Sequence, residues 1–249
     1  MNRPESSHFH LIFAGIDDTF DDEPEEEKDD ATIAVGDMEL SKTQYQNLYS
    51  NDSVKRHGYS DPLAHWPQAM VPVKISENAG FTAEFKEKIM KAMTYISSVS
   101  CITFDFEPED VENFLLIKKG PGCSSEVGYL SKGRQLMKLN PDCGYGNIVH
   151  EFLHVLGFLH MHTALNRDDF LIVNFKNIPH QYHNNFVKPT AHVSMYNTQY
   201  DFGSIMHYSR YAFALNRRRP TIVPFKDYDL IEKMGQRQGE ILKYRLFQI

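Results

Sequence analysis

The stretch HEFLHVLGFLH, residues 150–160, decides how the rest of the chain is interpreted. His150 and His154 are four positions apart, so a helix with 3.6 residues per turn places both on one face. Two imidazoles one turn apart can chelate a single zinc ion. Glu151, beside the first histidine, can then reach a water bound to that ion. The spacing therefore predicts a metal-binding helix.

Gly157 and His160 extend this site beyond the helix. A glycine adopts positive φ at little steric cost, so the helix can end there and the chain can turn back. His160 is then delivered as a third ligand. Three nitrogen ligands leave a coordination position open for water, whereas structural zinc sites are usually closed by four protein ligands. We therefore expect one catalytic Zn²⁺ per chain; the alternative is a structural cluster, or a zinc site without activity.

The acidic residues are concentrated at the N-terminus. The 249-residue chain has a formal net charge of −7, but residues 1–56 alone carry 14 acidic and five basic side chains. Residues 17–30 (DDTFDDEPEEEKDD) contain ten of these acids and are expected to be disordered. The rest is nearly neutral, without a basic face for nucleic acid. No apolar run approaches the ~18 residues of a membrane span, so neither partner is expected.

The three cysteines leave two interpretations open. Cys123 and Cys143 bracket a predicted hairpin and could pair, which would place the chain in an oxidising compartment. The alternative is three reduced thiols in a cytosolic protein. Cys101 has no partner left in either case. Residues 9–16 (FHLIFAGI) are apolar but short, and they match a signal peptide only poorly.

Periodicity predicts regular elements before the metal-binding helix and irregular chain after it. Alternation and apolar runs predict strands at residues 71–75, 101–106, 114–117 and 135–139. Apolar stripes predict helices at residues 83–97 and 146–156. We expect residues 135–139 to form an edge strand that could pair with an extended peptide.

Further motifs carry a resemblance to a known family. HExxHxxGxxH is the signature of the metzincins, and SIMHY at residues 204–208 resembles the Met-turn of the astacin zinc peptidases. Other blocks in matching order are Trp66-Pro67, CITF at residues 101–104, GCSSEVG at residues 122–128 and Arg167-Asp168-Asp169. The resemblance covers roughly residues 37–239, which is most of the chain.

The resemblance implies an α+β, zincin-like fold. Its N-terminal half would hold a twisted mixed sheet with two helices, its C-terminal half would be irregular, and the active-site cleft would lie between them. It also implies an endopeptidase that hydrolyses proteins or peptides through a zinc-activated water. Glu151 would transfer the proton, Tyr208 would stabilise the oxyanion, and Met206 would form an apolar floor beneath the zinc. A disulfide between Cys123 and Cys143 is implied as well.

The resemblance extends to a pro-segment. Astacin zymogens share an FxGD motif whose aspartate ligates the zinc; residues 34–37 (AVGD) keep the glycine and Asp37 but lose the aromatic. We expect residues 1–56 to be an acidic, largely disordered pro-segment and residues 57–249 to be the catalytic domain. An activating protease would cut near Arg56, after the dibasic pair. The implied product is a secreted monomer.

Some positions depart from the family pattern. Met161 replaces the glutamate that follows the third histidine in astacins, and Ala164 and Asn166 replace an arginine and an aspartate. Cys101 lacks its family partner, because no cysteine follows Cys143, so the C-terminal end is expected to be truncated or altered. Two alternatives follow: an inactive or permanently latent zinc-binding protein of this family, or an enzyme of another metzincin branch.

Overall fold

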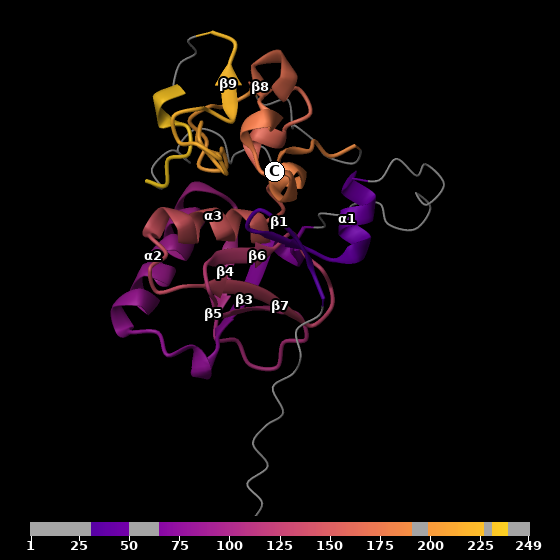
Figure 1. The fold of residues 1–249 in the computed structure, drawn as a ribbon. Helices are drawn as coiled ribbons and strands as arrows, with labels where there is room; N and C mark the ends of the chain where they lie inside the picture. The colour runs from indigo at the N-terminus through magenta and orange to yellow at the C-terminus, as the bar shows by residue number, and fades with distance from the viewer. Residues whose placement is uncertain (1–30, 50–64, 191–198, 227–230, 239–249) are drawn as a thin grey trace, which may run out of the picture. The chain divides into compact units, whose positions relative to one another are not determined.

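The computed structural model describes residues 31–49, 65–190, 199–226 and 231–238. These residues form a mixed sheet with helices, followed by a largely irregular part (Figure 1). The expected α+β architecture is therefore confirmed. None of the helices built from the described residues has both the length and the apolar character needed to cross a bilayer.

The main sheet has seven strands. Their spatial order is β1 (Ile33–Val35), β2 (Met38–Leu40), β6 (Cys123–Glu126), β7 (Arg134–Leu139), β5 (Phe114–Lys119), β3 (Met70–Ile75) and β4 (Thr103–Phe106). The pairs β1–β2 and β6–β7 are antiparallel, and all neighbours from β7 to β4 are parallel, as is β2–β6. Short strands rich in Val, Leu and Ile at the centre match the buried core of such a sheet.

Two long helices pack on the sheet. The first, α2 (Ala83–Val99), begins at Thr82, whose hydroxyl accepts a hydrogen bond from the backbone N–H of Phe85 at 3.2 Å. Its buried stripe repeats at helical spacing and comprises Phe85, Ile89, Ala92, Met93 and Ile96. The second, α3 (Tyr145–Val155), carries the two helical histidines and joins the same core. Both helices begin and end within two residues of their predicted bounds.

The prediction that residues 135–139 form an edge strand is wrong. These residues belong to β7, which lies between β5 and β6 inside the sheet. The strand beyond it, β6, is only four residues long and contains two serines, so its composition gave no strand signal. Pairing with β7, in the register Ser124 to Lys138, defines it as a strand.

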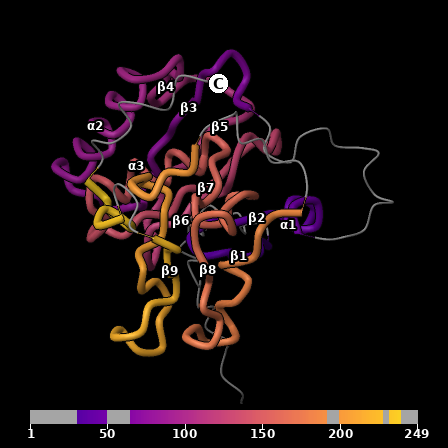
Figure 2. Tube along the Cα trace, turned by 90° about the horizontal axis from the view of Figure 1, so that it is seen from above, coloured from indigo at the N-terminus to yellow at the C-terminus, as the bar shows by residue number. Residues whose placement is uncertain are grey.

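Residues 31–49 are ordered, which differs from the expectation of a largely disordered N-terminal segment. They form β1, β2 and α1 (Lys42–Tyr49), and Figure 2 shows β2 between β6 and α1. Their apolar side chains pack in a small cluster with Val127, namely Val35, Met38, Leu40 and Leu48. Burial of these side chains and pairing of β2 with β6 supply the stabilisation that the acidic run cannot. Residues 1–30 lie outside the described part of the chain.

The C-terminal part is built mainly from turns. Its only paired strands within the described ranges are β8 (Leu171–Val173) and β9 (Ile222–Pro224), which are antiparallel. The short 3₁₀ helices of this part span Met161–Thr163, Arg167–Asp169, Phe175–Asn177, His180–Phe186 and Ile231–Lys233. Two others, Pro67–Ala69 and Glu77–Ala79, lie before and after β3 in the sheet part. A second apolar cluster around Phe186, Tyr200 and Tyr208 holds the C-terminal part together.

Cys123 and Cys143 form a disulfide that links β6 to the loop before α3. The thiol of Cys101 is free and exposed. Among the described residues, the two cysteines that spacing had suggested as partners are therefore the ones that pair.

Candidate metal centre

The geometry of the centre starts from α3. His150 and His154 lie one turn apart on this helix and are both buried. The helix ends after Val155, and Gly157 adopts φ of +94°. The backbone N–H of Phe158 then donates to the carbonyl of Leu153 at 2.9 Å, which closes the turn. This reversal carries the chain to His160.

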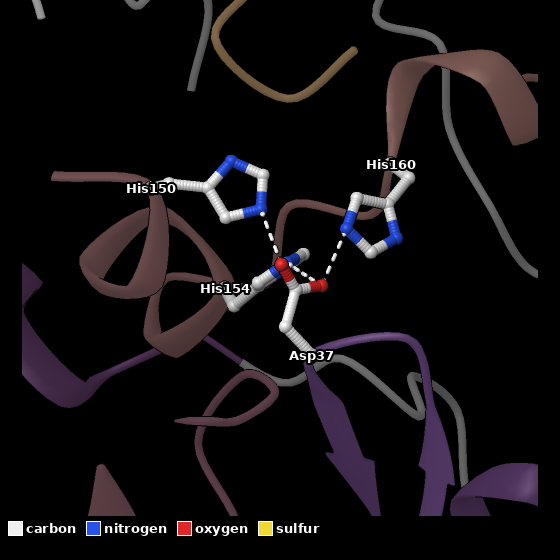
Figure 3. Close-up of side chains that lie close together, drawn as sticks. All are labelled: Asp37, His150, His154 and His160. Atoms are coloured by element: carbon white, nitrogen blue, oxygen red, sulfur yellow. Dashed lines mark ion pairs between the residues drawn. The ribbon is translucent and has the colours of Figure 1, made fainter. Parts of the chain in front are cut away.

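Four side chains converge in one place, as Figure 3 shows: Asp37 and the three histidines. One ligand atom from each lies within 4.8 Å of the others. The Nε2 atom of His160 is 2.7 Å from a carboxylate oxygen of Asp37, and the Nε2 atoms of His150 and His154 are 3.3 and 3.5 Å from its oxygens. The carboxylate therefore occupies the middle of the histidine cluster.

Hydrogen bonds on the far side of two rings set their tautomers. The Nδ1 atom of His150 lies 2.9 Å from the carbonyl oxygen of Ile205, and that of His154 lies 2.6 Å from the carbonyl oxygen of Phe158. A carbonyl can only accept, so each Nδ1 carries the proton and each Nε2 presents a lone pair to the centre. Such outer contacts are typical of metal-binding histidines.

The donor atoms fit a zinc ion. The buried Nε2 atoms of the three histidines and one carboxylate oxygen of Asp37 face one another, and none of them makes a hydrogen bond to any other described residue. Burial lowers the pKa of His150 to about 3, so its ring is neutral near pH 7. Three neutral nitrogens and one carboxylate are a normal donor set for zinc.

Glu151 lies beside this cluster on α3 and is almost completely buried. Burial, and secondarily the charge of Asp37, raises its pKa well above the usual value for a glutamate. The hydroxyl of Ser125 on β6 donates to its backbone carbonyl at 3.1 Å, which joins this turn of the helix to the sheet. A carboxyl with a raised pKa is suited to accept a proton and to return it.

Tyr208 lies on the other side of the centre, in the C-terminal part. Its ring stacks on His162 with centroids 3.9 Å apart and also contacts His160 at 4.5 Å. Its hydroxyl lies against the backbone of Gly36, which has φ of +71° and no room for a side chain. Burial, followed by the charge of Asp37, raises the pKa of Tyr208 well above 10, so its hydroxyl keeps the proton.

Met206 forms part of the turn under α3. Its side chain is buried in the main core, and its carbonyl oxygen accepts a hydrogen bond from the N–H of Met161 at 3.0 Å. Met161 itself packs against both apolar clusters. Met161, which departs from the family pattern, therefore lies where the sheet part and the C-terminal part meet, directly after His160.

Asn185 has a position that sequence reasoning did not predict. Its side-chain oxygen accepts a hydrogen bond from the N–H of Gly36 at 2.9 Å, and its carbonyl oxygen lies 2.9 Å from Nε2 of His162. It thereby links residues 31–49 to the ring stacked on Tyr208. His162 is a packing residue, as expected. In sequence, Asn185 stands in a polar run and gives no signal.

Arg237 is the other residue that the sequence did not single out. Its Nη1 atom donates to the carbonyl oxygen of Ile205 at 2.7 Å, the same oxygen that fixes His150. Its backbone carbonyl lies close against Gly146 on α3, where a side chain would not fit. The residue thus ties the C-terminal end of the described chain to the helix and to the Met206 turn.

The structure brings together seven predicted site residues: Asp37, His150, Glu151, His154, His160, Met206 and Tyr208. Among the remaining histidines, His207 is buried beside Tyr208, while His180 and His183 lie on a 3₁₀ helix and are not part of the candidate metal group. Arg56 and His192 fall outside the described residues.

Comparisons with known proteins agree with this geometry. Residues 58–241 match the model of the Astacin peptidase family. Seminal metalloprotease 1 of Drosophila melanogaster is 36% identical over 212 residues, which cover 81% of this chain and 83% of that protein. Tolloid-like protein 1 of Homo sapiens is 32% identical over 210 residues, but the chain spans only 20% of its length.

A solved structure is similar too. High choriolytic enzyme 1, a hatching enzyme zinc-protease from Oryzias latipes, superposes with a TM-score of 0.62 at 31% identity, covering 70% of this chain and 86% of that one. The metal-binding geometry, the family match and the shared fold lead to one conclusion. The chain belongs to the astacin family of zinc metalloendopeptidases.

Proposed function

We propose that this chain is a zinc-dependent endopeptidase that is made latent, with residues 31–49 holding Asp37 in the metal centre. One observation carries the proposal: the Asp37 carboxylate lies among the three histidines, 2.7 Å from Nε2 of His160. An ionised carboxylate is a competent zinc ligand. It would fill the position that a water and a substrate carbonyl need.

Several contacts outside the centre hold residues 31–49, which we call the latent segment, in place. Its apolar side chains pack against Val127, and the side-chain amide of Gln44 donates to the carbonyl of the same residue at 2.8 Å. The N–H of Thr190 donates to the carbonyl of Leu48 at 2.7 Å. With the bond from Gly36 to Asn185, these contacts span both halves of the catalytic part. They support a specific inhibitory fit.

Activation would follow cleavage between the latent segment and the catalytic domain. We assign residues 1–56 to the pro-segment and residues 57–249 to the catalytic domain, with the cut near Arg56. Cleavage there makes the latent segment a separate peptide, so its effective concentration at the centre falls as it diffuses away. An activating protease that recognises the dibasic pair Lys55-Arg56 is the expected partner.

The proposed chemistry assigns a role to each side chain. His150, His154 and His160 would hold the zinc. When bound, zinc supplies a Lewis acid, which lowers the pKa of a water toward about 7 and polarises the scissile carbonyl. Glu151 accepts a proton from the attacking water and passes it to the amine nitrogen of the leaving peptide. Its buried position on α3, next to His150, suits both transfers.

Tyr208 would act on the oxygen of the scissile carbonyl. Its hydroxyl keeps its proton near neutral pH and can donate a hydrogen bond as negative charge develops on that oxygen. In the latent chain this hydroxyl is covered by Gly36. Release of residues 31–49 would therefore free the donor as well as the metal.

We further propose that the substrates are proteins or peptides outside the cell. The Cys123–Cys143 disulfide supports an oxidising compartment, because such bonds persist there and are rare in the cytosol. Secretion can be tested by tagging the chain internally and measuring the fraction that reaches the medium. Retention of the tagged chain in reduced form inside the cell would contradict this part of the proposal.

The main test compares the full chain with the chain cleaved by limited trypsin digestion, using a quenched library of peptides. Only the cleaved chain should hydrolyse the library, and a zinc chelator should stop it. Glu151→Ala should lower the rate by about 10²–10⁴-fold, because general acid–base catalysis contributes that much. Glu87→Ala, on the exposed face of α2, is the matched control and should leave the rate unchanged.

A second experiment tests the latency switch. Asp37→Ala in the uncleaved chain should raise basal hydrolysis, since the centre loses its fourth ligand. High basal activity of the unmodified full chain, not altered by Asp37→Ala, would contradict the switch. A cleaved chain that is folded and zinc-loaded yet inert would instead support the alternative, an inactive or permanently latent zinc-binding member of the family. The exposed thiol of Cys101 and the methionine at position 161 give that alternative its basis.

A further inference from the structure

The latent segment covers the outer edge of β6. Its strand β2 runs parallel to β6, with Met38 opposite Ser125 and Glu39 opposite Glu126. The N–H of Ser125 donates to the carbonyl of Asp37 at 3.0 Å. Removal of residues 31–49 would leave these backbone groups of β6 unpaired, and an exposed strand edge is a template for an extended peptide.

Side chains along that edge alternate between two environments. Met38 and Leu40 are buried in the small cluster with Val127. Glu39, between them, points to the opposite face, where the hydroxyl of Ser124 donates to one of its carboxylate oxygens at 2.6 Å. Lys138 lies 2.8 Å from the other oxygen. Any extended chain on this edge places every second side chain on that face, whichever direction it runs.

The chemistry of this position favours a carboxylate. Ser124 and Lys138 face each other in the β6–β7 register, so both donors come from the rigid sheet. The neighbouring acid, Glu126, already has partners, since it accepts from Lys132 at 2.8 Å and from the N–H of Leu136 at 2.7 Å. Without Glu39, the ammonium of Lys138 would keep the hydroxyl of Ser124 nearby, and among the described residues no carboxylate would pair with it.

We infer that Lys138 and Ser124 form a subsite for an acidic side chain of the substrate, which Glu39 occupies in the latent chain. Glu39 is two residues from Asp37, and Asp37 lies at the metal centre. The acidic substrate residue therefore stands about two residues from the bond that is cut. The inference rests on the proposed function and names the substrate class: peptides with Asp or Glu near the cleavage site.

The experiment uses the full chain activated by limited trypsin digestion. Matched quenched peptides carry Glu, Gln or Lys at the second or third position on either side of the scissile bond, and kcat/KM is measured for each. At one of these positions kcat/KM for the Glu peptide should exceed that for the Gln peptide about fivefold, the size expected for a partly buried, charge-assisted pair. Higher ionic strength should reduce the preference.

Variants then assign the preference to the two donors. Lys138→Met should reduce the Glu/Gln ratio to about one, and Lys138→Glu should invert it in favour of the Lys peptide; Ser124→Ala should give an intermediate ratio. Lys91→Glu makes the same charge change on the exposed face of α2 and should keep the wild-type ratio. Circular dichroism checks that each variant is folded.

A binding measurement separates this inference from the proposed function. The activated Glu151→Gln variant is titrated with the same fluorescent peptides, and anisotropy gives Kd without turnover. A Glu preference in Kd that disappears with Lys138→Met supports the subsite even if no peptide is cleaved. Wild-type protein with no acidic preference, or a preference that Lys138→Met leaves intact, overturns it.

Discussion

The two halves of the catalytic part supply the centre in different ways. Residues 65–157 form a sheet with two helices, and the helical repeat alone places His150, Glu151 and His154. Residues 158–238 have little regular structure, yet they supply His160 and Tyr208. In the first half local geometry positions the ligands, whereas in the second half only long-range contacts do so. The regular half should therefore be the more autonomous one.

Several contacts join the halves next to the metal centre, and two of them are made by Ile205 and Arg237 of the irregular half. The carbonyl oxygen of Ile205 accepts a hydrogen bond from the ring of His150. The backbone carbonyl of Arg237, whose side chain donates to the same Ile205 oxygen, lies against Gly146 on α3. A metal ion held by the helical pair and by His160 would be the third tie. The difference between the halves can be tested by removing these contacts one at a time.

Metal removal should have the largest effect. Chelation of zinc from the activated enzyme should abolish hydrolysis, and it should leave three lone pairs facing one another at His150, His154 and His160. Amide hydrogen exchange should then accelerate at least about tenfold more in residues 158–238 than in β3, β5 and β7, because the irregular half loses its main anchor. Equal acceleration of hydrogen exchange in both halves would contradict the proposed difference between them.

A matched pair of core substitutions should separate stability from activity. Phe152 and Phe186 are both fully buried, the first against Phe104 and the second beside His162 and Tyr208. Each change to alanine should lower the free energy of unfolding by about 4 kcal/mol. Only Phe186→Ala should also reduce kcat per folded molecule, by about tenfold, because it loosens the support of Tyr208. Urea unfolding and active-site titration measure both quantities; a kcat loss confined to Phe152→Ala would contradict the expectation.

A pH dependence should arise in the irregular half. His207 is fully buried, with Nδ1 2.7 Å from the carbonyl of Tyr208 and Nε2 2.7 Å from the hydroxyl of Tyr200. Burial lowers its pKa from 6.5 to about 4. The unfolded chain therefore binds the proton more tightly, and stability falls as pH drops from about 6.5 to about 4, by about 3 kcal/mol for this group.

The variant His207→Gln keeps a donor and an acceptor at that position but does not titrate. Urea unfolding of the metal-free protein should be measured at pH 7 and pH 4. Between these pH values the free energy of unfolding should fall by about 3 kcal/mol less in the variant than in the wild type. Identical losses would mean that His207 does not contribute to the pH dependence.

The smallest effect should come from loss of the hydrogen bond that Arg237 donates to the carbonyl of Ile205. Arg237→Met removes the donor to Ile205 and should cost about 2 kcal/mol of unfolding free energy, in the range for a hydrogen bond to a charged group. Arg218→Met, in an exposed turn, is the matched control and should change it by less than about 0.5 kcal/mol. Equal values for the two variants would show that Arg237 does not hold the Met206 turn.

The sequence predicted the regular half well, and the reasons are local. The stripes that include Phe85 and Ile89 gave helix bounds within two residues, and the strand cores were found by alternation. The failure at β7 has a physical cause as well. Whether a strand lies at the edge of a sheet depends on its neighbours in space. β6 is a strand only because it pairs with β7, and its sequence does not reveal that pairing. The ordered structure of residues 31–49 was not predicted, because their four buried apolar side chains are a weak signal next to the acidic run at residues 17–30.

The sequence by itself determined the metal-binding chemistry. Ligand spacing on a helix, a glycine that ends it and a third histidine depend on local geometry, so HEFLHVLGFLH was sufficient to predict that these three histidines come together. Only the tertiary structure decided the ring tautomers, the position of Tyr208 beside Gly36, and the pairing of Glu39 with Lys138. These features join residues that are 55, 172 and 99 positions apart. No local propensity encodes such contacts, because they form only when the whole chain packs.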